Sequence, residues 1–194
     1  DYQKLTYDAQ EFMPVWGGFV VRGYGKLGYG NDLPFYKNFY AGGYGSVRGY
    51  DNSSLGPKYP SVIFQETAQT DQDQEEVGGN ALVQFGTELA LPLPFKGDWA
   101  RQVRPVLSAE GAPVFDTKCY VPSGNILVNS SNVDIKQYCK DNYNFNFDNM
   151  RYSVGVGFTW ITMIGPLSLS YAFPLNDKKG DDTKSIQFEI GRTF

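Results

Sequence analysis

Apolar and polar residues alternate with a period of two along seven segments of the chain, a spacing that places successive side chains on opposite faces of a β-strand. The segments are residues 4–11, 18–29, 79–91, 103–115, 151–163, 166–173 and 184–194. Alternation of this kind gives each strand one face toward water and one toward an apolar environment. The pattern therefore predicts an all-β protein with antiparallel strands.

The segments 151–163 and 166–173 carry large apolar residues on one face and small or polar residues on the other. In the first of them, the large face consists of Tyr152, Val154, Val156, Phe158 and Trp160, and the small face of Ser153, Gly155, Gly157 and Thr159. A soluble sandwich would place its large residues inside and its charged residues outside. A lipid-facing exterior and a polar interior are instead typical of a transmembrane β-barrel.

The last segment has the pattern of the final strand of a bacterial outer-membrane barrel. Residues 185–194 read S-I-Q-F-E-I-G-R-T-F, with Ile186, Phe188, Ile190 and the terminal Phe194 on one face. An aromatic residue at the end of such a strand suits the membrane–water interface. We interpret this stretch as a C-terminal outer-membrane signal.

The connections between the segments also alternate, with short ones near residues 12–17 and 164–165 and long ones at 30–78 and 116–150. Outer-membrane barrels have short periplasmic turns and long extracellular loops, so both long loops should be extracellular and the C-terminus periplasmic. Seven strands are an odd number, whereas bacterial single-chain barrels have an even number. We therefore expect residues 1–194 to be the C-terminal part of a larger barrel in a Gram-negative outer membrane.

Composition supports a β-rich protein and argues against most enzymes. The 194 residues include 22 Gly, 14 Tyr and 14 Phe. The mean hydropathy of -0.38 does not exclude a membrane protein, because polar loops dilute the alternating strands. The absence of histidine removes the commonest general base and metal ligand, and a net charge of -4 argues against a nucleic-acid binder. We expect no catalytic activity, no metal and no cofactor.

Two cysteines, Cys119 and Cys139, lie in the second long loop. In an exported protein, two cysteines in a polar loop predict a disulfide, whereas in a cytosolic protein they would be free thiols. A disulfide here would close a loop of roughly twenty residues and stabilise the protein by about 3 kcal/mol in the chain-entropy description. The sequence favours the disulfide.

The first long loop places a single arginine among glycines. It contains F-Y-A-G-G at residues 39–43 and S-V-R-G-Y at 46–50, which indicates a tightly folded backbone that presents Arg48. Its guanidinium suits carboxylates, and two acids, Glu88 and Glu110, should point into the lumen from neighbouring strands. Loss of Arg48 should leave both acids without a partner. Because unpaired buried acids are costly, this loss should destabilise the folded loop.

The motifs of the chain resemble those of a known family. F-Y-A-G-G, V-R-G-Y and S-L-G-P in a long loop, followed by T-E-L, P-L-P-F, G-P-L-S-L-S-Y-A-F-P-L and the final Q-F-E-I-G-R-T-F, are similar to the BamA family of outer-membrane assembly factors. The resemblance covers essentially the whole chain in order. V-R-G-Y is shared with a wider superfamily of insertases and translocators, and the flanking motifs favour the BamA family.

The resemblance implies a sixteen-strand barrel preceded by periplasmic POTRA domains, which lie outside this chain. It implies that the long loop folds back into the lumen, where Arg48, flanked by Val47, Gly49 and Tyr50, meets Glu88 and Glu110. It also implies a weak lateral seam at the last strand, formed here by Phe188, Ile190, Gly191 and Phe194, with an inward kink at Gly191. A glycine there should weaken strand pairing.

The function implied by the resemblance is insertion of β-barrel proteins into the outer membrane as the core of the BAM complex. Its partners would be nascent outer-membrane proteins, BAM lipoproteins bound mainly through the POTRA domains, and membrane lipid with lipopolysaccharide. Nucleic acid is not expected, and the isolated fragment should be able to pair with a second copy through its open edges. A secretion pore of the same superfamily, or a small stand-alone barrel of enzyme or adhesin type, are the alternatives.

Overall fold

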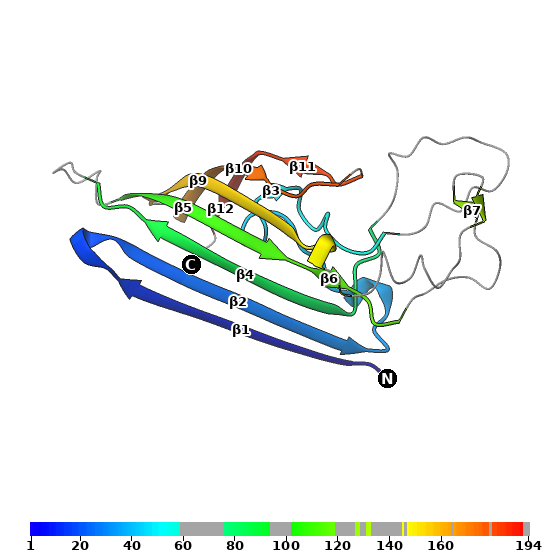
Figure 1. The fold of residues 1–194 in the computed structure, drawn as a ribbon. Helices are drawn as coiled ribbons and strands as arrows, with labels where there is room; N and C mark the ends of the chain where they lie inside the picture. The colour runs from blue at the N-terminus through cyan, green and yellow to red at the C-terminus, as the bar shows by residue number, and fades with distance from the viewer. Residues whose placement is uncertain are drawn as a thin grey trace.

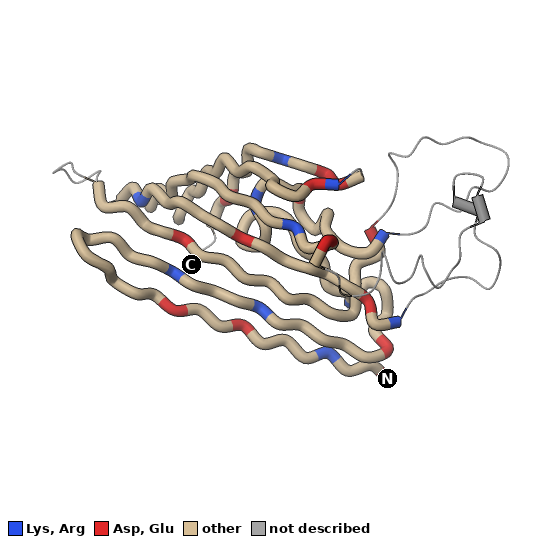
Figure 2. The backbone as a smooth tube through the Cα atoms, viewed as in Figure 1, with Lys and Arg blue, Asp and Glu red and all other residues tan. Residues whose placement is uncertain are grey.

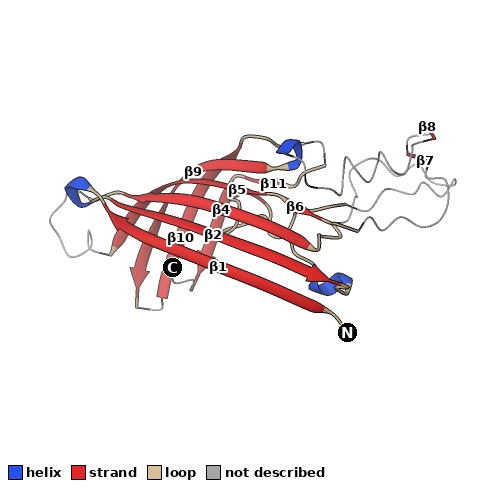
Figure 3. Cartoon of the chain, turned by 60° about the horizontal axis from the view of Figure 1, so that its bottom comes forward, coloured by secondary structure: helices blue, strands red, loops and turns tan. Residues whose placement is uncertain are grey.

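The computed structural model places strands side by side in one curved sheet (Figures 1 and 3). The structure describes residues 1–58, 76–93, 102–118, 127–128, 131–132, 145, 147–163, 165–178 and 180–191. No helix within these residues is long and apolar enough to cross a membrane.

Each strand of the main sheet pairs antiparallel with its neighbours, in the order β1-β2-β4-β5-β9-β10-β12, and β6 extends the sheet beside β4. The strands are β1 Gln3–Pro14, β2 Val20–Asn31, β4 Ala81–Ala90, β5 Val103–Ala112, β6 Val114–Phe115, β9 Arg151–Thr162, β10 Gly165–Pro174 and β12 Ile186–Ile190. Two small ribbons pair β3 Gly49–Tyr50 with β11 Thr183–Lys184, and β7 Leu127–Val128 with β8 Ser131–Asn132. Short 3₁₀ turns cover Trp16–Gly18, Phe35–Lys37 and Phe147–Asn149.

The two faces of the sheet have the character that the alternation predicts. On β9, Ser153 and Thr159 are buried, whereas Val156, Phe158 and Trp160 are exposed. Leu169, Tyr171 and Phe173 of β10 and the large apolar residues of β12 are exposed in the same way. The predicted all-β barrel sheet, with large residues outside and small or polar residues inside, is confirmed. We call the face that carries the small residues the inner face.

Most predicted strands are found with their ends shifted by at most three residues, and two differ by more than that. Segment 103–115 is interrupted at Pro113, which has no N–H to donate, although its carbonyl still accepts a hydrogen bond from the Val83 N–H at 3.1 Å. The final strand begins at Ile186 rather than at residue 184, because Lys184 pairs with Gly49 of the long loop. Phe194 lies outside the described residues.

Opposite charges face each other across neighbouring strands of the first half of the sheet (Figure 2). Lys26 of β2 lies opposite Asp8 of β1, and Arg22 of β2 lies opposite Glu88 of β4. The Lys26–Asp8 ion pair spans 3.5 Å between exposed side chains, whereas the Arg22–Glu88 pair spans 2.9 Å and is largely buried. The inner face of this part of the sheet therefore carries charged side chains, as the wall of a water-filled lumen does.

The apolar core lies between the long loop and the inner face. The loop contributes most of it, and the cluster consists of Phe39, Ala41, Val47, Tyr50 and Leu55 together with Leu82 of β4 and Ala112 of β5. The loop is therefore packed against the strands, and this packing positions Arg48.

Candidate functional site

Arg48 and two acids meet on the inner face of the sheet. The Arg48 side chain is 1% exposed, and its Nη2 forms an ion pair with Glu88 and lies 3.1 Å from Oε1 of Glu110. The backbone N–H of Arg48 donates to Oε2 of Glu110 at 2.7 Å. The structure thus brings together the three residues that the sequence singled out, and it anchors the loop through both side chain and backbone.

Each acid has a second partner on β2 that the sequence analysis missed. Nη1 of Arg22 donates to Oε2 of Glu88 at 2.9 Å, and the Tyr24 hydroxyl donates to Oε1 of Glu110 at 2.5 Å. The expectation that loss of Arg48 would leave both acids without a partner is therefore wrong. With Arg48 absent, Glu88 would keep a cation and Glu110 would keep a hydroxyl donor.

Strand register explains why these partners escaped prediction. Alternation places Arg22 and Tyr24 on the inner face, but it does not show which residues of β4 and β5 lie beside them. Tyr24 lies opposite Gly86, which in turn lies opposite Glu110. A Cβ on Gly86 would lie 2.4 Å from the Tyr24 ring. The missing side chain thus lets the ring cross β4 and reach Glu110 on β5.

Aromatic rings stack on both arginines of the cluster. The Arg48 guanidinium carbon lies 4.7 Å from the centre of the Tyr44 ring, and that of Arg22 lies 4.5 Å from the centre of the Tyr24 ring. Stacking of a guanidinium on an aromatic face contributes about 0.5–2 kcal/mol, more when the pair is desolvated. These contacts hold the planar groups in orientations that suit the carboxylates.

Glycines with left-handed backbone angles shape the loop around Arg48. Gly42, Gly43 and Gly49 have φ of 103°, 91° and 90°. A Cβ on Gly42 would lie 2.4 Å from the carbonyl oxygen of Asp51. The F-Y-A-G-G motif therefore supplies a chain reversal that other residues would not fit.

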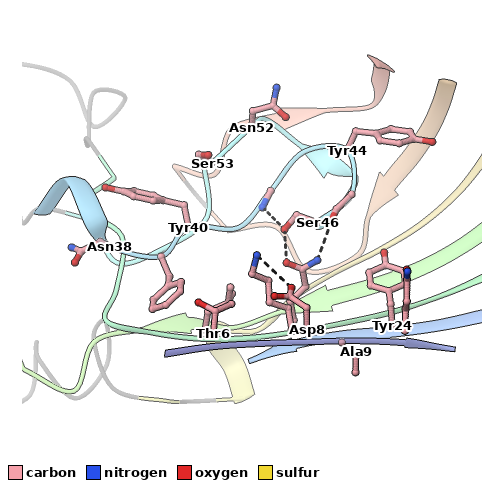
Figure 4. Close-up of a pocket in the computed structure, with 18 of the residues that line it drawn as sticks. Thr6, Asp8, Ala9, Tyr24, Asn38, Tyr40, Tyr44, Ser46, Asn52 and Ser53 are labelled. Atoms are coloured by element: carbon pink, nitrogen blue, oxygen red, sulfur yellow. Dashed lines mark hydrogen bonds and ion pairs between the residues drawn. The ribbon is translucent and has the colours of Figure 1, made fainter. Parts of the chain in front are cut away.

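A second set of hydrogen bonds fixes the loop to β4 (Figure 4). Ser46 Oγ accepts from the Gly42 N–H at 3.2 Å and donates to Oε1 of Gln84 at 3.2 Å. Nε2 of Gln84 donates to the Gly45 carbonyl at 3.1 Å. The tip of the loop is thus tied to the same strand that carries Glu88.

A cavity of about 860 Å³ separates the loop from β1 and β2 (Figure 4). Its lining includes Lys4, Asp8, Arg22 and Lys26, so it is polar and charged. A space of this kind is suited to water rather than to an apolar ligand.

The remaining residues of the predicted loop motif are buried beside Arg48. Val47 and Tyr50 are 0% exposed, and Gly49 is buried. Burial raises the pKa of the Tyr50 hydroxyl to about 12. This hydroxyl lies 3.5 Å from the carbonyl oxygen of Tyr152. The motif residues therefore serve to seat the loop.

The residues predicted for the seam lie on β12 and just beyond it. Phe188 and Ile190 are exposed on the outer face. Regular strand geometry ends at Ile190, and Gly191 has a φ of 82°. Cys119 and Cys139 lie outside the described residues, so the disulfide stays a prediction.

Replacement of Gly191 by alanine is expected to destabilise the end of β12 by about 1 kcal/mol, since a left-handed backbone strains a residue with a Cβ. Among the described residues beyond its two chain neighbours, no atom lies within 4 Å of the added Cβ, so the cost is attributed to backbone conformation. Denaturant unfolding of the full-length protein in detergent measures the effect. Asparagine tolerates left-handed backbone angles better than alanine, so Gly191→Asn should recover part of the lost stability. Equal stability of the wild type and both variants would contradict a left-handed backbone at Gly191.

The sequence of this chain is similar to those of known proteins. The chain is 33% identical to the outer membrane protein assembly factor BamA of Neisseria meningitidis serogroup B over 100% of its own length, which is 24% of that protein. It is 26% identical, over 99% of its length and 35% of the relative, to the human sorting and assembly machinery component 50 homolog. The chain thus spans about a quarter to a third of these relatives.

The fold is also similar to a solved structure. The crystal structure of BamA from Haemophilus ducreyi lacking POTRA domains 1-3 matches with a TM-score of 0.74 and 30% identity, over 96% of this chain and 34% of that one. The model of the Omp85 superfamily domain matches residues 1–194. The antiparallel sheet, the inward-folded V-R-G-Y loop and these matches agree, and the chain belongs to the Omp85 superfamily.

Proposed function

We propose that this chain is the C-terminal part of the barrel of an outer-membrane insertase, which folds β-barrel proteins into the Gram-negative outer membrane. The observation that carries the proposal is the long loop seated on the inner face by Arg48, Glu88 and Glu110. The names of the relatives, an outer membrane protein assembly factor and a sorting and assembly machinery component, support it. No covalent chemistry is required, because insertion exchanges lipid and strand contacts.

The proposed mechanism uses β12 as the weak side of a seam. This strand has 5 residues in the sheet, fewer than the 10 of its partner β10, and the regular strand ends before Gly191. Its edge opposite β10 pairs with no strand in the described residues. An edge strand of this kind can template a client strand through backbone hydrogen bonds. Within a complete sixteen-strand barrel, the same edge would meet the first strand and could part from it.

The proposed orientation puts the C-terminus in the periplasm and has the long loops 30–78 and 116–150 leave the sheet on the extracellular side, from which the segment around Arg48 folds back onto the inner face. Nascent outer-membrane proteins would reach the seam from the periplasmic side. BAM lipoproteins would bind mainly through POTRA domains, while lipid and lipopolysaccharide would contact the exposed apolar outer face of β9, β10 and β12.

Reconstitution of the full-length protein into vesicles tests the function. A urea-unfolded β-barrel client is added, and its folding is followed on a gel by the appearance of the heat-modifiable band, which only the folded barrel gives. We expect faster client folding with this protein than with empty vesicles or with vesicles that hold an unrelated porin. Ion conductance or export of a secreted client without faster folding would instead indicate a translocation pore.

A further inference from the structure

The loop segment that follows Arg48 pairs with the segment that precedes the last strand. Gly49 and Tyr50 of β3 lie opposite Lys184 and Thr183 of β11 in a two-residue antiparallel ribbon. The ribbon is extended by the Asp51 N–H, which donates to the carbonyl of Asp182 at 2.8 Å. The arginine loop therefore touches the connection that leads directly into β12.

A side chain of β12 itself reaches the same loop segment. Gln187 is 6% exposed, and its Nε2 donates to the Tyr50 carbonyl at 2.5 Å. The Tyr50 carbonyl lies two residues from Arg48 in sequence. A buried hydrogen bond of this kind links the last strand to the cluster of Arg48, Glu88 and Glu110 through a short, rigid piece of backbone.

The loop also packs closely against the end of β10, the strand that holds β12 in the sheet. A Cβ on Gly49 would lie 3.2 Å from the backbone nitrogen of Pro174 and 3.4 Å from the Ala172 carbonyl oxygen. Pairing of β12 with β10 extends over Ile186–Ile190. The inner contacts from the loop thus add to a short ladder of backbone hydrogen bonds.

We propose that Gln187 is a positioning residue that couples the seat of the Arg48 loop to the last strand, so that release of the loop loosens β12. The coupling rests on the proposed insertase function, for which it supplies a control of the seam. With the loop seated, Gln187 and the β3–β11 ribbon hold β12 from inside. With the loop displaced, the backbone hydrogen bonds to β10 are left to hold it. These extend from Ser185, whose carbonyl accepts from the Ala172 N–H, to Gly191, whose N–H donates to the Pro166 carbonyl.

Amide hydrogen exchange of the full-length protein in lipid nanodiscs tests the coupling. Gln187→Ala should speed exchange at residues 186–190 by roughly three- to tenfold, the effect of one hydrogen bond. Arg48→Ala should do the same, although Arg48 lies on the loop. By reciprocity, Gln187→Ala should also speed exchange at the Asp51 amide, which loss of local strand propensity alone would not do.

A matched control is available on the same face. Ser170 of β10 lies directly opposite Gln187 and is 2% exposed, and its hydroxyl has no hydrogen-bond partner within the described residues. Ser170→Ala should leave exchange at residues 186–190 unchanged. This control shows whether truncating any buried side chain on the inner face of β10 and β12 speeds exchange, or only the side chain that contacts the loop.

The double variant gives the decisive result. If the loop and Gln187 act through one contact, Arg48→Ala and Gln187→Ala together should change exchange at residues 186–190 by less than the product of their separate effects. Independent, multiplying effects, or no change at β12 in Arg48→Ala, would overturn the coupling. Failure of the wild-type protein to speed client folding, with the coupling intact, would instead overturn the proposed function.

Discussion

Substitution of Arg48 by alanine in the full-length protein is expected to weaken the docked loop by about 3 kcal/mol, the lower end of the cost of breaking a buried ion pair. The lower end applies because Arg22 still pairs with Glu88 and the Tyr24 hydroxyl still donates to Glu110. Urea unfolding in detergent, read by heat modifiability, measures the loss, and client folding in vesicles measures its effect on assembly.

The same argument predicts strong coupling between the two arginines. In Arg48→Ala, Arg22 is the remaining cation within 4 Å of Glu88 among the described residues. Removal of Arg22 as well should therefore cost more than the sum of the two single substitutions. An additive double variant would show that Glu88 is not shared in the folded protein.

Lys26 provides the matched control for the arginine variants. It lies on β2 as Arg22 does, but its partner Asp8 is 3.5 Å away and both side chains are exposed, 40% and 64%. Such a pair contributes about 0–1 kcal/mol. Lys26→Ala should therefore be close to wild type, and an Arg48→Ala protein that is equally stable and active would refute the role of the buried cluster.

Local pattern was enough to predict the faces of the strands. Val156 and Ser153 of β9 lie on opposite faces because alternation is a property of the strand itself. The two acids, Glu88 and Glu110, could be placed on the inner face in the same way. Arg48 is singled out instead by the glycines around it, and the resemblance to the BamA family implies that its loop folds into the lumen. Pattern could not place Tyr24 beside Glu110, because that contact depends on the register of three strands and on the space left by Gly86.

The start of the last strand shows a second limit of sequence pattern. Lys184 directly precedes the alternating residues from Ser185 onward, so the sequence predicts one strand over residues 184–194. In the structure Lys184 instead pairs with Gly49, which lies 135 positions earlier in the chain. Two-residue pairing of distant segments carries no periodic signal, and tertiary contacts decide it.

Replacement of Gly42 by alanine is expected to prevent the loop from seating. The substitution combines a left-handed φ of 103° with a Cβ 2.4 Å from the backbone oxygen of Asp51, which cannot rotate away. Strain and overpacking together should cost about 3 kcal/mol or more. Since seating buries Arg48, the unseated loop should be cut by trypsin after Arg48 in intact vesicles, where the wild-type protein is protected at this bond.

Gly23→Ala is the control for this variant, because a Cβ on Gly23 of β2 would have no atom of a non-neighbouring described residue within 4 Å. An alanine in a strand with room for it is neutral or mildly stabilising, by up to about 1 kcal/mol. Trypsin should therefore leave Arg48 protected in Gly23→Ala and cut after it in Gly42→Ala. Protection of Arg48 in both variants, with client folding at the wild-type rate, would mean that the glycine turn does not determine the seat of the loop. The ion pairs of Arg48 and the apolar contacts of Val47 and Tyr50 would then be sufficient to hold it.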